Sequence, residues 1–302
     1  MPARSLLHYA LEVPDQTAGQ RFYRDFGLLE ATGRDNAVRL RPGPLERAQV
    51  LLYGGSKKRL HHLAFGAPGP DYEATRRALV SWGAREVDSP AGAPEGGFWV
   101  RDPDGHYVNV RDETPKAPPP DPPLELNSPG HAPRQVRRGA PPPDMQAAPR
   151  RLGHVLLFTP DLERQLDFYT RGLGLKLSDR CQKIITFLRC STDHHNLALL
   201  TSNAPGFHHG SFEVGSVDEI AMGARRMRAH GWEPFWGLGR HVIGSNFFYY
   251  IRDPWGSFAE YYFDLDYIPE TCAWEPRDWP EGDALYRWGP DCPAEFGINT
   301  EV

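Results

Sequence analysis

The sequence predicts an α+β protein of two domains, each built from two modules in which a strand and a helix are followed by three strands. Three observations support this fold class. The chain has 302 residues, about twice the ~150 residues of one typical domain. Its two halves repeat one another, and a proline-rich segment separates them. Within each half, strand patterns and helix-capping signals alternate twice in the same order.

Four motifs recur in the same order in the two halves. The first half contains LHYALEVPD, QRFYRDFGLLE, RLHHLAF and VRDPDGHYVNV, and the second contains GHVLLFTPD, LDFYTRGLGLK, FHHGSFEV and IRDPWGSFAEYY. His8 and His154 are 146 positions apart, and His62 and His209 are 147 apart. Such ordered self-similarity predicts that the two halves share one fold.

The C-terminal half shows the module pattern most clearly. HVLLF predicts a strand, Asp161 a helix N-cap and Gly172 the end of that helix, before strands at IITFL and NLALL. The next module begins with the strand HHGSFEV. Ser216 and Glu219 then have capping-box spacing, and the helix is expected to end at Gly231. Strands at FFYYI and FAEYYF follow in the second module.

The segment between the repeats is expected to be an extended linker. Twelve of the 38 residues from Glu113 to Arg150 are proline, a composition that favours a semi-rigid chain over a packed core. The predicted domains are therefore 1–112 and 151–302, joined by a linker over 113–150. From Asp264 the chain is rich in Trp and Pro, and we expect this tail to wrap the second domain as a packing element, with a border to the substrate mouth or to a subunit interface as the alternatives.

Charge and cysteine content exclude several classes of protein. The net charge of -5 argues against a nucleic-acid-binding protein, which should be basic. No apolar run approaches 18 residues, so no transmembrane helix is expected. The first residues are too soon polar for a signal peptide, and a cytoplasmic protein is expected. The four cysteines form no CxxC pair, whereas there are 12 histidines, so a bound metal should have imidazole and carboxylate ligands.

His154, His209 and Glu260 are the candidate metal ligands. The two histidines lie near the starts of the two C-terminal modules, and the glutamate lies on the last strand. Two imidazoles and one carboxylate form the facial triad of non-haem Fe(II) oxygenases, which leaves other coordination positions for substrate and dioxygen. Any three such residues are a weak signal, and their order and context strengthen it.

The chain resembles the two-domain type I extradiol ring-cleavage dioxygenases of the vicinal oxygen chelate superfamily. The resemblance runs from about Leu6 to Asp264 with the linker excepted. It is strongest in GHVLLFTPDLERQLDFYTRGLG, FLRCSTDHHNLALL, FHHGSFEV, GRHVIGSNFFYYIRDPWG and FAEYYFDLDY. It implies a glyoxalase-like fold and an Fe(II) cofactor, although Mn(II) prefers similar ligands.

The resemblance assigns roles to six residues: His154, His209 and Glu260 as metal ligands, and His195, His241 and Tyr250 as further catalytic residues. It implies that His195 acts as an acid–base beside the reacting oxygen, a task that suits imidazole. It also implies that His241 and Tyr250 hydrogen-bond the substrate oxygens. Their neighbours His194 and His208 are expected to be packing or surface residues, because adjacent side chains of a regular strand point to opposite faces.

Residues of the substrate pocket are less well defined by the sequence. The resemblance places Phe187 near the pocket, and four residues between His241 and Tyr250 are candidates to line it: Val242, Ile243, Ser245 and Asn246. Five aromatic residues suit a wall around an aromatic ring and a hydrophobic core equally well: Phe207, Trp232, Trp236, Phe247 and Phe248.

The N-terminal half carries a partial copy of the metal site. His8 and His62 match the two histidine ligands, but Asn109 stands in the place of Glu260 and Trp99 in the place of Tyr250. An amide is a poor substitute for an anionic ligand of Fe(II). The N-terminal domain is therefore expected to be non-catalytic, as the resemblance also implies.

The activity implied is extradiol cleavage of a catechol-like diol or triol, in which both atoms of O2 enter a muconic semialdehyde-type product of aromatic-compound degradation. Homo-oligomers are usual among such enzymes. Two alternatives remain: another metalloenzyme of the superfamily, such as a glyoxalase-type isomerase or a thiol transferase, and a non-catalytic aromatic-binding protein. The 4-hydroxyphenylpyruvate dioxygenases share the triad without the further three residues. The sequence leaves the ring substituents and the side of cleavage open.

Overall fold

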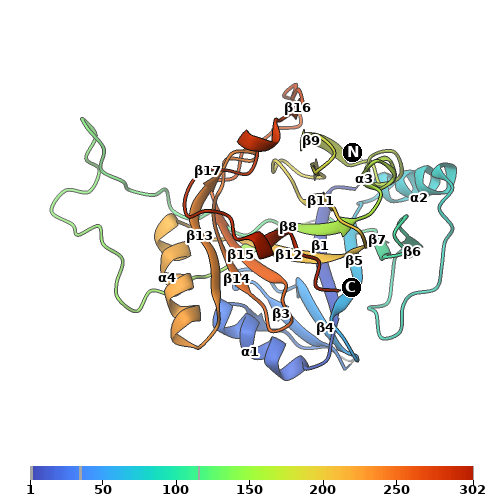
Figure 1. Cartoon of the computed structure of the whole chain (residues 1–302), viewed down its shortest axis with the longest axis horizontal. Coiled ribbons are helices and arrows are strands. Elements are labelled where there is room, and N and C mark those ends of the chain that lie inside the picture. Colours follow the sequence, from blue (N-terminus) through green and yellow to red (C-terminus); the bar gives the residue numbers. More distant parts are fainter. Residues whose placement is uncertain (1–2, 34–35, 115, 302) are drawn as a thin grey trace.

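The computed structural model describes residues 3–33, 36–114 and 116–301 (Figure 1). Two mixed β-sheets form its framework, one of seven strands from the N-terminal half and one of ten strands from the C-terminal half and tail. Helices follow the first strand of each module, as the sequence predicts. The predicted α+β fold class with repeated modules is confirmed.

The N-terminal sheet has the strand order β2-β3-β4-β1-β5-β7-β6. Its elements are β1 (Ser5–Val13), α1 (Gln16–Phe26), β2 (Leu29–Glu30), β3 (Val38–Arg41), β4 (Val50–Gly54), β5 (Arg59–Gly66), α2 (Pro70–Trp82), β6 (Phe98–Arg101) and β7 (Tyr107–Arg111). The second module has two strands where three were expected. In place of the third strand there is an isolated β-bridge between Glu86 and Val100. The following SPAGAPEGG stretch is rich in Pro and Gly, which do not sustain a ladder.

The C-terminal sheet has the order β16-β9-β10-β11-β8-β12-β15-β14-β13-β17. Its strands are β8 (Arg151–Thr159), β9 (Lys176–Cys181), β10 (Ile185–Arg189), β11 (Leu197–Thr201), β12 (Gly206–Glu213), β13 (Pro234–His241), β14 (Phe247–Arg252), β15 (Phe258–Phe263), β16 (Arg277–Asp278) and β17 (Tyr286–Trp288). Helix α3 (Leu162–Asp167) continues as a π-helical turn, Phe168–Gly172, and α4 is Val217–Ala229. Asp161 and Ser216 cap these helices by accepting from the amides of Arg164 and Glu219, as predicted.

The two sheets have the same internal pairing. In the first, β1 pairs antiparallel with β5 and parallel with β4, while β5 pairs parallel with β7. In the second, β8 pairs antiparallel with β12 and parallel with β11, while β12 pairs parallel with β15. This correspondence confirms the repeat and places matching residues of the two halves at equivalent points of their sheets.

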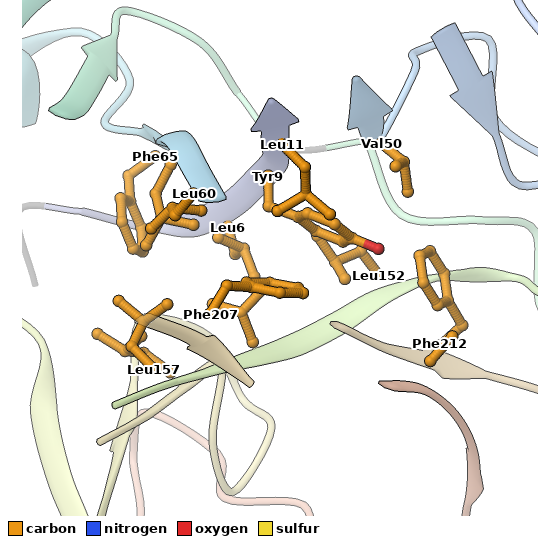
Figure 2. Packing of buried hydrophobic residues seen from close by; sticks show 14 of the residues in the cluster. Leu6, Tyr9, Leu11, Val50, Leu60, Phe65, Leu152, Leu157, Phe207 and Phe212 are labelled. Carbon is orange, nitrogen blue, oxygen red and sulfur yellow. The ribbon is translucent and has the colours of Figure 1, made fainter. Parts of the chain in front are cut away.

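The two halves pack closely together. Tyr9 of β1 stacks on Phe207 of β12 with ring centroids 4.9 Å apart, and Leu6 and Leu152 fill the layer around them (Figure 2). Helix α1 lies beside α4 (Figure 1), where Phe26 stacks on Tyr261 at 3.8 Å. A single hydrophobic core therefore runs through both sheets, and burial of its side chains stabilises the contact between the halves.

The proline-rich segment and the C-terminal tail differ in secondary structure and in how they pack. Most described residues of 113–146 are exposed and form neither helix nor strand, and this segment leaves the body of the molecule as a long excursion (Figure 1). The tail instead extends both edges of the second sheet, with β16 on β9 and β17 on β13. None of the helices in the described parts of the chain has the length and apolarity needed to cross a membrane.

Candidate metal centre and active site

Three buried side chains converge from three neighbouring strands. His154 comes from β8, His209 from β12 and Glu260 from β15. Ser211 of β12 pairs with His154 on one side and Glu260 on the other, and His209 lies two residues earlier on the same strand. Since side chains two apart share a face of a strand, all three point to one side of the sheet. One potential ligand atom of each lies within 4.8 Å of the others.

The donor atoms of this triad fit a divalent metal ion. The Glu260 Oε2 atom lies 3.1 Å from His154 Nε2 and 3.4 Å from His209 Nε2. His209 Nε2 is buried and has no hydrogen-bond partner, a costly state that a metal bond would relieve. Burial lowers the pKa of His209 well below its ordinary 6.5, so the ring is neutral with a lone pair to donate. Two imidazole nitrogens and one carboxylate suit a first-row transition metal.

His208 sets the tautomer of the His209 ligand. Its Nε2 lies 2.7 Å from the carbonyl oxygen of Phe296, and its Nδ1 lies 2.6 Å from His209 Nδ1. Burial lowers the pKa of His208 to about 4, so its ring is neutral and its single N–H points to the carbonyl. His209 must then donate from Nδ1, which leaves Nε2 free for the metal. His208 is therefore a buried packing residue that also orients the His209 ring. The alternative expectation, that His208 lies on the surface, is wrong.

The other three predicted residues surround the triad. The His195 ring lies 4.2 Å from the ring of His154, and both are buried. Tyr250 pairs with Glu260 across β14 and β15, and its hydroxyl lies 3.0 Å from His241 Nε2. His241 Nε2 is 3.8 Å from Glu260 Oε1. The structure therefore brings all six predicted residues into one cluster.

Burial also sets the protonation of these groups. It lowers the pKa of His195 well below 6.5 and lowers that of His241 as well. Burial and then the Glu260 carboxylate raise the pKa of Tyr250 well above 10. At neutral pH the cluster thus offers neutral imidazoles and a protonated phenol. A neutral imidazole can accept a proton, and a protonated phenol can donate one.

The chain matches known proteins over nearly its whole length. Residues 151–261 match the model of the glyoxalase/bleomycin resistance protein/dioxygenase superfamily, and residues 8–111 match that of a glyoxalase-like domain. Metapyrocatechase 2 of Cupriavidus necator is 43% identical over 99% of this chain and 92% of that protein. The chain is an extradiol dioxygenase of this superfamily.

Two further similarities bear on the metal of this dioxygenase. The manganese-dependent 2,3-dihydroxybiphenyl 1,2-dioxygenase of Geobacillus genomosp. 3 is 26% identical over 94% of this chain and 93% of its own. The crystal structure of the Mn(II)-bound glyoxalase from Novosphingobium aromaticivorans superposes with a TM-score of 0.76 at 26% identity, covering 95% of this chain and 93% of the other. A divalent metal site at His154, His209 and Glu260 agrees with both.

The five residues predicted to line the pocket of the dioxygenase differ in what they contact. Phe187 of β10 packs against the ring of His195 and against buried Ile243. The Asn246 amide donates to Glu260 Oε1 at 3.3 Å, so it contacts a metal ligand. Ser245 is turned toward the Asp266 carboxylate at 2.9 Å, and Val242 is half-buried.

The five aromatic candidates for the pocket wall also lie in different parts of the structure. Phe207 and Trp232 belong to the core between the halves, where Trp232 Nε1 donates to Asp25. Trp236 and Phe248 pack beside His241, with centroids 5.7 and 4.0 Å from its ring. Phe247 packs on Phe263 at the end of β15 and on Trp288 of the tail.

Sequence reasoning left the place of the tail open and missed the contacts that it makes in the dioxygenase site. The carbonyl oxygen of Leu285 accepts from His241 Nδ1 at 2.7 Å, so the neutral ring accepts from the Tyr250 hydroxyl at Nε2. Trp279 and Ala284 pack in the apolar cluster of Phe187 and Ile243. A backbone carbonyl leaves no signature in side-chain identity, so no motif was available to reveal the first contact.

Proposed function

We propose that this dioxygenase cleaves the ring of a catechol-like diol or triol beside the hydroxyl groups, with both atoms of O2 entering a muconic semialdehyde-type product. The observation that carries the proposal is the convergence of His154, His209 and Glu260 at one buried point. The 43% identity to metapyrocatechase 2 over nearly the whole chain supports it. O2 and a small aromatic diol are the proposed substrates.

We propose Fe(II) as the resident metal. Mn(II) is the alternative to test, because one relative named above is manganese-dependent. When bound, the metal would supply charge stabilisation and a template for the two substrate oxygens and O2. Two neutral imidazoles and one carboxylate leave part of its positive charge uncompensated, which favours binding of an anionic catecholate.

The remaining side chains bind and orient the substrate. The Tyr250 hydroxyl and His241 Nε2, 3.0 Å apart beside Glu260, are proposed to hydrogen-bond the substrate oxygens. His195 is proposed to hold and return a proton beside the reacting oxygen. Phe187 and Ile243, in one apolar cluster beside His195, are proposed to contact the aromatic ring. Val242, Ser245 and Asn246 shape the turn that follows β13.

The division of labour between the halves is part of the proposal. Residues 151–302 hold the whole triad and are proposed as the catalytic domain, 1–112 as its non-catalytic partner and 113–150 as the linker. A cytoplasmic location and a homo-oligomeric state remain predictions.

An oxygen-uptake assay tests the function. The protein is loaded with Fe(II) or Mn(II) without oxygen, and catechol, 3-methylcatechol, hydroxyquinol and 2,3-dihydroxybiphenyl are then added in an oxygen electrode. We expect oxygen uptake with at least one diol, together with the yellow colour of the ring-fission product. Absence of uptake with all four substrates and both metals would refute the proposal and favour an isomerase or a binding protein. Metal analysis of protein purified without oxygen identifies the resident ion.

A further inference from the structure

A row of buried polar side chains lies behind His195. The Nδ1 atom of His195 is 3.1 Å from Nδ1 of His194, and Nε2 of His194 is 3.1 Å from Oδ2 of Asp179. All three side chains are buried. A carboxylate can only accept, so His194 donates from Nε2 to Asp179. His194 is therefore bound on both sides, and its surface alternative is wrong.

The C-terminal tail holds the far end of this row. The amide of Arg277 donates to Asp179 Oδ1 at 2.6 Å, where β16 pairs with β9. The amide of His194 donates to the Asp266 carbonyl at 2.9 Å. The Trp274 ring meets the His194 ring edge-on at 5.6 Å, and its Nε1 donates to the Ser178 carbonyl. Asp179 and His194 thus each have contacts that fix their positions from the side away from the metal triad.

Comparison with the other histidine doublets sets this row apart. The sequence has three His-His pairs, at 61–62, 194–195 and 208–209, and in each the two Nδ1 atoms lie 2.6 to 3.1 Å apart. The outer ring of the first and third pairs ends on a backbone carbonyl, of Ala91 and Phe296. Only the 194–195 pair ends on a carboxylate. A charge-assisted hydrogen bond is about twice as strong as a neutral one, so it holds its ring more firmly.

We propose, on the basis of the function proposed above, that Asp179 and His194 are positioning residues for ring cleavage. They hold the His195 ring by its Nδ1 side, which leaves Nε2 as the nitrogen available to the reacting oxygen. Neither residue hydrogen-bonds a metal ligand. Both neighbour Phe187, because the His194 ring lies 6.2 Å from its ring and Asp179 pairs with it across β9 and β10, so the Kd of catechol shows whether substrate contact changes as well. Their hydrogen bonds reach the site through His195, whose orientation decides the efficiency of proton transfer.

The test compares His194→Phe and Asp179→Asn with the wild-type enzyme loaded with Fe(II). His194→Phe keeps an aromatic ring against Trp274 and removes both hydrogen bonds, while Asp179→Asn removes only the charge. We expect kcat with catechol to fall about 10- to 100-fold, the range typical of partners that orient a functional side chain. Metal content and the Kd of catechol measured without oxygen should stay at wild-type values. Thr186→Val is the matched control, because its buried hydroxyl on β10 has no partner and should leave kcat unchanged.

A double-mutant cycle separates positioning from general destabilisation. Because the row acts through His195, adding His194→Phe to His195→Phe should lower kcat no further. Wild-type kcat in both single variants, or a full additional loss in the double variant, would overturn the inference. If His194→Phe does not fold, Asp179→Asn in the same cycle decides. Failure of the proposed function itself is distinguishable, because the wild-type enzyme would then show no oxygen uptake.

Discussion

The two halves of the dioxygenase place corresponding residues at equivalent points of two sheets, and among the described residues only the C-terminal set fits a metal. In the N-terminal half, Trp99 pairs with Asn109 across two strands, as Tyr250 pairs with Glu260 in the C-terminal half. His8 and His62 occupy the places of the histidine ligands. Their Nε2 atoms, however, lie 2.9 Å apart and hydrogen-bond each other. The nitrogens that would bind a metal thus satisfy one another.

The missing carboxylate explains much of this difference. The Asn109 amide donates to the carbonyl oxygens of Gly96 and Phe98, so it is turned to its own backbone surroundings. Burial, followed by the positive charges of Arg47 and Arg111, lowers the pKa of His8 to about 3. A cationic surrounding that disfavours a protonated histidine also disfavours a divalent ion. The lost carboxylate, the His8–His62 hydrogen bond and the nearby arginines together separate the two sites on the same fold.

Exchanging the carboxylate in the functional half should have the largest effect. Glu260→Gln gives the C-terminal site an amide, as in the N-terminal half. We expect metal and activity to be lost together, with turnover down about 1,000-fold or more. Changing a residue that only hydrogen-bonds a metal ligand already lowers metal affinity or activity by about 10- to 100-fold. His209→Ala should behave alike. Metal analysis and oxygen uptake measure both, and Glu163→Gln on the surface is the matched control. Retention of metal by Glu260→Gln would contradict the role given to the charge.

Changing the oxygen-side histidine should separate metal binding from turnover. His195→Phe keeps the packing against Phe187 and His154 but removes the acid–base group. We expect unchanged metal content and a loss of kcat of about 100- to 10,000-fold, the usual contribution of a general acid–base. Full activity in this variant would remove the proton-transfer role of His195.

Acid should destabilise the metal-free N-terminal pair. The folded-state pKa of His8, about 3, lies below the 6.5 of the unfolded chain. As pH falls from 6.5 toward 3, the unfolded state therefore binds a proton first, and stability is lost by roughly 1 kcal/mol per pH unit. Above pH 6.5 this dependence disappears. Urea unfolding between pH 7 and 4.5 should show a shallower slope for His8→Gln, with or without added metal. Parallel curves for the two proteins would contradict this assignment.

Restoring the charge in the N-terminal half should have the smallest effect. Asn109→Asp supplies a carboxylate where Glu260 stands in the other half. We expect no second metal ion, because His8 and His62 still bind each other and Arg47 and Arg111 remain close. Metal content and turnover should equal those of the wild-type protein. An additional equivalent of metal per chain would show that the lost carboxylate alone separates the two sites.

Much of the fold and the catalytic cluster could be predicted from the sequence. Caps at Asp161 and Ser216 depend on residues three positions apart, so local spacing predicted them correctly. The resemblance predicted that His154, His209 and Glu260 are the metal ligands, and each lies on a strand as expected. The pairing of those strands in the structure puts the three side chains on one face. The prediction of three strands after the second N-terminal helix was wrong in part. A Pro- and Gly-rich stretch follows the helix, and the strand expected before β6 is reduced to one bridge.

The sequence by itself determined which chemical groups are available and in what order they meet the sheet. Only the tertiary structure decided how those groups are held. The carbonyl oxygens of Leu285 and Phe296 fix the tautomers of His241 and His208, and backbone atoms have no residue identity to read. The Asp179–His194 row depends on contacts between β9, the tail and a loop far apart in the chain. Burial decides protonation at these sites, and burial is a property of the packed molecule.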